Sequence, residues 1–148
     1  MHIPFRRTAL AAGVAGLTFL GISGTAHAAS ESAVTPAARQ DVCFTGACGS
    51  GTIDYQGPTY AGVKLSVNDT ACDAHAPKIR IREYGFDGGG IEYTNYGPWH
   101  TDNNGCHGGY AQWNALHYQN DQGIEAIAIE ICNNGKCKVS ARMYNPYR

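Results

Sequence analysis

Long apolar stretches are scarce in this sequence. Apart from one run from about Ala9 to Ile22, no segment approaches the roughly 20 consecutive apolar residues that a membrane-spanning helix needs. No window of useful length shows the apolar stripe of an amphipathic helix either. These absences argue against a helical protein, and we expect no membrane partner for the processed chain.

The sequence also lacks an excess of charge of either sign. It carries 11 Lys and Arg residues against 12 Asp and Glu residues, a net charge of −1. Removing a leader that contains Arg6 and Arg7 changes this balance to 9 against 12, or about −3. Basic residues come close together only at Lys78, Arg80 and Arg82. A mildly acidic chain does not attract nucleic acid, so we expect no nucleic-acid partner.

Motifs that announce an enzyme are missing as well. Neither a His-Glu-x-x-His zinc motif nor a Gly-x-Ser-x-Gly nucleophile motif occurs. The cysteines do not show the Cys-x-x-Cys spacing of a zinc site. The runs 87–90 and 102–105 offer oxygen atoms but lack the alternating acidic positions of a calcium loop. We therefore expect no metal and no cofactor.

The N-terminal segment has the pattern of an export signal. Arg6 and Arg7 precede the apolar run, and Ala26-His27-Ala28 supplies small residues at a cleavage site. Residues 1–28 are therefore predicted to be a cleaved signal peptide. The mature protein is expected to be secreted, in an oxidising extracellular compartment.

Six cysteines all follow this leader, which predicts a disulfide framework. Two pairs have the short spacing Cys-x4-Cys, so we expect Cys43 to bond Cys48 and Cys132 to bond Cys137. By elimination, Cys72 would then bond Cys106. Six cysteines allow many pairings, and the sequence by itself does not choose among them.

The mature chain divides into a short arm and one domain. Residues 29–41 are small and polar without periodicity, and are expected to form a flexible N-terminal arm. Residues 42–148 contain about seven short segments in which apolar and polar residues alternate, as in an all-β protein. They are 52–56, 62–68, 78–84, 91–96, 110–119, 124–132 and 138–144. One-sided alternation is typical of antiparallel sheets, so we predict a single antiparallel β-sandwich stapled by disulfides.

The last hairpin allows a more detailed prediction. Asn134-Gly135 is a strong signal for a two-residue type I′ turn, in which both central residues have positive φ. Such a turn places Cys132 opposite Cys137. At a non-hydrogen-bonded position the two Cα atoms are then close enough for a disulfide.

Further along the same hairpin, continuing the register that pairs Cys132 with Cys137 conflicts with the apolar pattern. It sets Ile129 opposite Ser140, which mixes core and solvent faces. A shift of one residue sets Ile129 opposite Val139 and Ile127 opposite Ala141. We therefore predict a β-bulge just beyond the disulfide.

Histidines offer one route to chemistry. His100, Asp102 and His107 fall in a single loop, where imidazoles and a carboxylate could together do acid–base work. An exported hydrolase or nuclease built on His100, His107 or His117 is accordingly one alternative function. The simpler interpretation is a polar loop tied down by Cys106, with its histidines in solvent.

Aromatic residues interleaved with amides give the stronger functional signal. They gather in the middle third of the chain, where flat rings beside amide groups suit carbohydrate faces and protein surfaces alike. Trp113, between two alanines, is expected to face the core, whereas Trp99 follows Gly97-Pro98 and is expected outside. The candidate ligand-binding residues are Tyr96, Trp99, His100, Asp102, Asn104 and His107.

The leading hypothesis is a non-catalytic extracellular binding module, a monomer whose partner is a glycan or a protein surface. A second alternative is a protease inhibitor that presents the loop 43–48, braced by its disulfide, to an enzyme. Such preorganisation would limit the entropy lost on binding.

Overall fold

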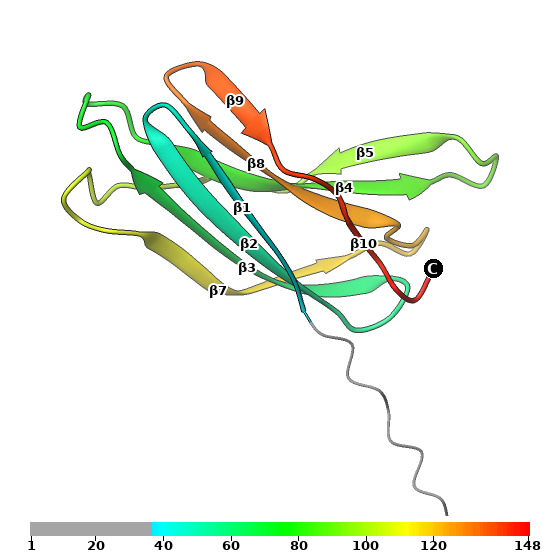
Figure 1. Ribbon diagram of the computed structural model, residues 1–148. Coiled ribbons are helices and arrows are strands. Elements are labelled where there is room, and N and C mark those ends of the chain that lie inside the picture. The colour runs from blue at the N-terminus through cyan, green and yellow to red at the C-terminus, as the bar shows by residue number, and fades with distance from the viewer. Residues whose placement is uncertain (1–36) are drawn as a thin grey trace, which may run out of the picture. The chain divides into compact units, whose positions relative to one another are not determined.

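The computed structural model describes residues 37–148 (Figure 1). The predicted signal peptide, residues 1–28, lies outside the described residues, as does most of the predicted arm, residues 29–41. The first strand, β1 (Ala38–Phe44), already pairs with its neighbour from Ala38 onward. Residues 38–41, at the end of the predicted arm, are therefore part of β1.

Sheet A contains four antiparallel strands in the order β1-β2-β3-β7. They are β1, β2 (Ala47–Tyr55), β3 (Tyr60–Asp69) and β7 (Ala111–Gln119). β3 and β7 closely match predicted segments, whereas the predicted segment 52–56 overlaps only the end of β2. β1 was missed, because Val42 is its one buried residue and the segment shows no repeating apolar pattern.

Sheet B contains six antiparallel strands, with β8 and β4 at its centre. One edge is formed by β9 and β10, and the other by β5 and β6. The strands are β4 (Lys78–Phe86), β5 (Glu92–Tyr96), β6 (His100–Thr101), β8 (Ala126–Asn133), β9 (Lys136–Val139) and β10 (Met143–Tyr144). β6 was not expected, and the segment 138–144 is divided between two strands.

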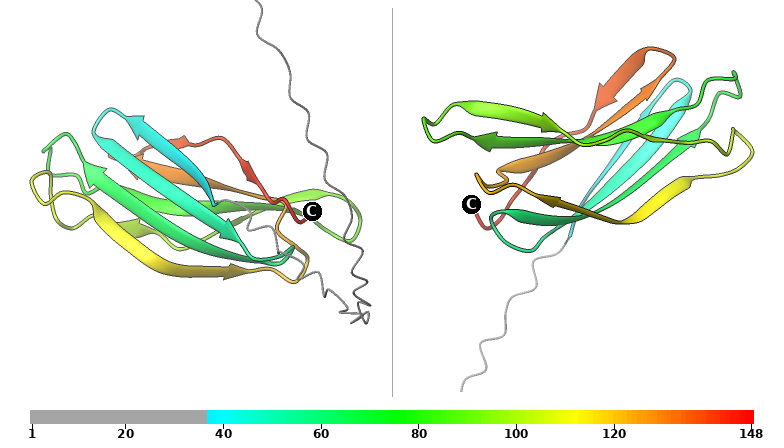
Figure 2. Two further views of the ribbon diagram at one scale, coloured as in Figure 1. Left: turned by 60° about the horizontal axis from the view of Figure 1, so that its bottom comes forward. Right: turned by 180° about the vertical axis from the view of Figure 1, so that it is seen from behind.

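The two sheets face each other in two layers, with the β4–β5 hairpin extending beyond sheet A (Figure 2). The described residues form no helix, and therefore none that could cross a lipid bilayer. The predicted all-β antiparallel sandwich is confirmed. Its strands number ten rather than about seven, because short edge strands lack a readable period.

The core lies between the sheets and follows the alternation in the sequence. Val63, Leu65 and Val67 of β3 are buried, and so are Ile79 and Ile81 of β4. From β8, alternate isoleucines at 127, 129 and 131 complete the apolar layer. The Tyr55 hydroxyl donates to the Met143 carbonyl oxygen at 2.6 Å, tying β2 to β10 across the sandwich.

β2 and β8 approach closely because β2 presents two glycines to the core. A Cβ atom at Gly49 would lie 2.8 Å from Cγ2 of Ile131, closer than real contacts allow. A Cβ atom at Gly51 would lie even closer to Cγ2 of Ile129. The two isoleucines therefore fill the space that β2 side chains would otherwise occupy.

Three disulfides are present, with the pairings expected from spacing and elimination. Cys43 bonds Cys48, Cys72 bonds Cys106, and Cys132 bonds Cys137. The described residues contain no free cysteine. The Cys72–Cys106 bridge closes the longest loop, with a sequence separation of 34. In the chain-entropy model it contributes about 4 kcal/mol, against about 2 kcal/mol for each short bridge.

The β-bulge predicted just beyond the Cys132–Cys137 bridge is wrong. Cys132 lies opposite Cys137, and the same register sets Glu130 opposite Val139. It continues to Ser140, whose N–H donates to the Ile129 carbonyl oxygen at 2.9 Å. The turn and the disulfide from which the bulge was inferred are nevertheless present, with φ of 47° at Asn134 and 74° at Gly135.

Register changes only beyond Ser140, where Met143 lies opposite Ile127. The bulge was predicted on the assumption that Val139 faces the inner core. Instead Val139 packs with Tyr84 and Ala128 in a second cluster on the outer face of sheet B. β8 is buried on both faces, so an apolar residue of β9 can pack on either side of it. The unshifted register therefore leaves Val139 buried rather than exposed to solvent.

Trp113 packs against the core, as predicted, but the alternation of β7 is interrupted. Leu65 lies opposite Trp113, whereas Val63 lies opposite Leu116. Asn114 and Ala115 thus oppose one residue of β3 and form a β-bulge. Both Trp113 and Leu116 consequently point inward, although strict alternation would place them on opposite faces.

Gly51→Ala should destabilise the fold by about 1–3 kcal/mol, because the added methyl group overpacks the β2–β8 contact. Gly62→Ala is the matched control, since a Cβ at Gly62 meets no atom closer than 3.7 Å. Chemical denaturation of both variants with disulfides intact measures the difference. Equal stability of the two variants would contradict the close approach of the sheets.

Candidate functional site

The structure separates the six residues that the sequence grouped as a candidate site. Tyr96 and Trp99 lie with the arginines of β4 on the outer face of sheet B. His100 stacks against Trp113, with ring centroids 4.9 Å apart. Asn104 and His107 are exposed in the loop that carries Cys106. Two pairs are brought together: Tyr96 and Trp99 through their shared neighbour Arg80, and Asp102 and Asn104 through a hydrogen bond.

Asp102 is a structural residue of this loop. Its side chain is only 1 % exposed, and both carboxylate oxygens accept backbone hydrogen bonds. The donors are the N–H groups of Asp69, at 3.1 Å, and Asn104, at 2.9 Å. Asp102 thereby ties the loop to the end of β3, and its oxygens are occupied.

The candidate histidines make separate contacts. His117 lies on β7, and its Nδ1 is 2.7 Å from the Tyr60 hydroxyl. Burial lowers the pKa of His100, whose Nε2 has no hydrogen-bond partner. Within residues 37–148, no ion pair or hydrogen bond joins His100, His107 or His117 to a carboxylate. The arrangement gives no support to acid–base chemistry by histidine.

Metal ligation finds no support among the described residues either. The clusters of His, Cys, Asp and Glu side chains that come close enough are built around Cys72–Cys106 and Cys132–Cys137. Sulfur atoms in a disulfide are not thiolates, and the thiolate is the metal-binding form. These clusters are disulfides with a neighbouring side chain.

The loop between Cys43 and Cys48 is docked on the body of the protein. It contains a two-residue turn, since Phe44 already pairs with Ala47. Ala47 is fully buried, and the Gly46 carbonyl oxygen accepts a hydrogen bond from Asn133 Nδ2 at 3.1 Å. Only Thr45 and Gly46 therefore remain unpaired in this turn.

A row of alternating cations and aromatic rings lies on the outer face of sheet B. This cation–ring ladder consists of Lys78, Trp99, Arg80, Tyr96 and Arg82. The Arg80 guanidinium lies 4.2 Å from the ring centroids of both Tyr96 and Trp99. Lys78 Nζ lies 4.5 Å from the Trp99 ring, and Arg82 lies 5.4 Å from that of Tyr96. Cation–π contacts of this kind contribute about 0.5–2 kcal/mol each.

Glu130 of β8 holds the two arginines of this ladder in place. Its carboxylate accepts hydrogen bonds from Arg80 Nε at 2.7 Å and from an Arg82 terminal nitrogen at 2.6 Å. The Glu130 side chain is 4 % exposed. Burial opposes its ionisation, but the hydrogen bonds from Arg82 and Arg80 outweigh this and hold the pKa of Glu130 below its ordinary value.

A groove of about 560 Å³, with many polar side chains in its lining, lies on the outer face of sheet A. Strand register builds it, because directly opposed residues of antiparallel strands point to the same side. Asp41 lies opposite Ser50, Ser50 opposite Ser66, and Ser66 opposite Gln112, in a row that crosses all four strands. The small serines form the floor and hydrogen bond to each other at 2.7 Å.

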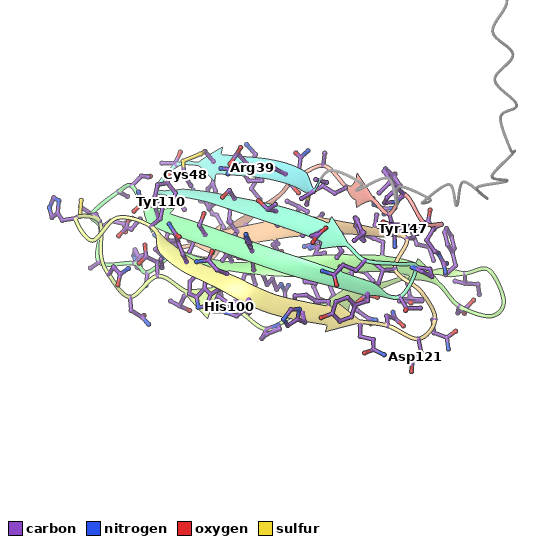
Figure 3. All side chains as sticks on the ribbon, turned by 90° about the horizontal axis from the view of Figure 1, so that it is seen from below. Arg39, Cys48, His100, Tyr110, Asp121 and Tyr147 are labelled. Carbon is purple, nitrogen blue, oxygen red and sulfur yellow. A yellow bond between two sulfur atoms is a disulfide. The ribbon has the colours of Figure 1, made fainter. Side chains whose placement is uncertain are left out.

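Larger side chains form the rims of this sheet A groove. They are Arg39, Asp41, Lys64, Tyr110, Gln112 and Asn114. Arg39 pairs with Asp41 at 2.9 Å, so these two charges largely cancel. Tyr110 is 53 % exposed. Figure 3 shows Arg39, Cys48 and Tyr110 towards one end of the sheet, with Asp121 and Tyr147 towards the other.

Tyr110, Gln112 and Asn114 belong to the region where aromatic and amide residues interleave in the sequence, whereas the opposite wall of the groove was not predicted. Arg39 and Asp41 fall in the segment assigned to a flexible arm. A signal was available, because a disulfide between Cys43 and Cys48 implies paired strands that continue backward from Cys43. Ser50 carries no such signal, since its place depends on register.

No family model matches the chain, and no curated protein matches it.

Glu130→Gln should lower the free energy of unfolding at neutral pH by about 1.5–3 kcal/mol, the usual worth of hydrogen bonds to a charged group. Because the pKa of Glu130 is depressed, this advantage is present above the ordinary value of 4.5 and is lost as pH falls through the folded-state pKa. Denaturation curves at neutral and strongly acidic pH measure both effects.

Glu92→Gln is the matched control, because Glu92 forms an exposed ion pair with Arg142. Its loss should cost less than about 1 kcal/mol. A Glu130 variant no less stable than the Glu92 variant would show that Glu130 does not organise the ladder.

Proposed function

We propose that this protein is a secreted, non-catalytic binding module that recognises a glycan in the sheet A groove. The observation that carries the proposal is the row of hydroxyl and amide side chains across four strands, with an exposed tyrosine at its end. The three disulfides fit an extracellular protein. Export through the N-terminal signal sequence is part of the proposal.

The chemistry of the groove suits a sugar chain. Hydroxyls of Ser50 and Ser66 and amides of Gln112 and Asn114 both donate and accept hydrogen bonds, as sugar hydroxyls do. The exposed ring of Tyr110 provides an apolar face with a polar tip. With Arg39 and Asp41 paired, Lys64 leaves the groove lining with a net charge of about +1, low enough to accept a neutral glycan.

The aromatic rings of sheet B are less suited to this role. A sugar that stacks on a ring needs an uncovered ring face, and Tyr96 and Trp99 have cationic side chains stacked close to theirs. Trp99 is half-buried rather than fully exposed. These features favour the groove over the ladder as the glycan site.

The two alternatives have weaker support. A hydrolase or nuclease would need a histidine near a carboxylate, and the histidines lie apart. A protease inhibitor that acts through residues 43–48 would need a protruding loop, and that turn is docked against Asn133.

Asn114→Ala should weaken binding of the mature, oxidised protein to its polysaccharide by about tenfold, which corresponds to about 1.4 kcal/mol. Tyr110→Ala should do the same through loss of the ring. A screen against insoluble neutral polysaccharides identifies the ligand, and depletion or calorimetry then compares the variants.

Gln119→Ala is the control, because Gln119 is exposed on the same strand but outside the groove. It should bind as the wild type does. Loss of binding in the control alone, or no neutral polysaccharide bound by the wild type, would reject the groove as a glycan site.

A further inference from the structure

A second hollow lies on the opposite sheet, where the cation–ring ladder ends. Its volume is about 420 Å³, and it is bordered by the β8–β9 hairpin and the start of β4. Its lining includes His75, Lys78, Trp99, Asn134 and the Cys132–Cys137 disulfide. It belongs to the outer face of sheet B and is separate from the sheet A groove.

Lys78 at this hollow is a cation without a counterion. Within residues 37–148, its Nζ makes no ion pair and no hydrogen bond; its described contact is with the Trp99 ring at 4.5 Å. Arg80, the next cation along the strand, uses Nε to bind Glu130. Its two terminal nitrogens remain as donors in the fork geometry that suits a carboxylate.

The face as a whole is positive on an acidic protein. Lys78, Arg80 and Arg82 are balanced here by Glu130 alone, whereas the mature chain carries an overall charge of about −3. A local excess of positive charge attracts an anionic partner and orients its approach. The occupant of this face should therefore be acidic.

Spacing favours a polypeptide as that occupant. Alternate residues of β4 point to one side, so Lys78 and Arg80 repeat at about 6.8 Å along the strand. Alternate side chains of an extended peptide repeat at the same distance. Arginine, tyrosine and tryptophan are also the residue types enriched at the centres of protein interfaces.

We propose that the outer face of sheet B is a docking surface for an extended acidic segment of a partner protein. Carboxylates on alternate residues of that segment pair with Lys78 Nζ and the terminal nitrogens of Arg80, next to the hollow beside Trp99. Glu130 already holds the arginines in place. The surface is therefore preorganised and loses little side-chain entropy on binding.

The test uses two peptides on the mature, oxidised protein. One alternates Glu with Thr; the other has as many Glu residues but places two Thr between successive ones, so that in an extended chain they point to opposite sides. We expect the alternating peptide to bind at least tenfold more tightly, with an affinity that falls as salt is added. Lys78→Gln should weaken it about tenfold, and Lys78→Arg should restore it.

Lys136→Gln is the control, because Lys136 is an exposed lysine of the neighbouring hairpin that does not line the hollow. It removes the same charge and should leave peptide binding unchanged. No binding of the alternating peptide, equal affinity for both peptides, or equal loss in the Lys78 and Lys136 variants would overturn the proposal. Binding of an oligogalacturonate but of neither peptide would replace the protein partner with an acidic glycan.

Discussion

The arrangement of the outer face of sheet B depends on the buried carboxylate of Glu130, which must be paired with cations. Glu130 stands in β8, a strand whose residues are all buried, so its charge is removed from water. A buried carboxylate is stable only when it is paired and hydrogen-bonded, and Arg80 and Arg82 supply both. Once fixed, the two guanidiniums stack on Tyr96 and Trp99. One buried charge thus determines where the arginines and rings of this face lie.

The two sheets consequently present different chemistry to solvent. Sheet B exposes ordered cations and rings, which suit an acidic polypeptide. Sheet A exposes small hydroxyl side chains bordered by amides, which suit a neutral glycan. A sandwich keeps both faces rigid, because apolar side chains between the layers and three disulfides hold the sheets in place. A module that binds a different ligand on each face could link a glycan to a protein.

Local patterns in the sequence predicted the inward residues of β3, β4 and β8, because strand alternation is a property of successive residues. Spacing likewise predicted the two short disulfides, and elimination the third. Features set by contacts between distant segments were missed. The bulge in β7 depends on β3, and the second cluster at Val139 depends on Tyr84. The environment of Trp99 was unpredictable for the same reason, since the cations that cover it come from β4. The groove was not predicted either, because it depends on how four strands pair with one another, and no single segment of the sequence contains that information.

The decisive measurement is two-dimensional NMR of the isotope-labelled mature protein, titrated with a neutral oligosaccharide selected by the polysaccharide screen. The account predicts shift changes at Ser50, Ser66, Gln112 and Asn114, with the indole signal of Trp99 unmoved. Changes centred on Trp99 and Tyr96, with sheet A silent, would contradict it, because the rings would then be free to receive a sugar.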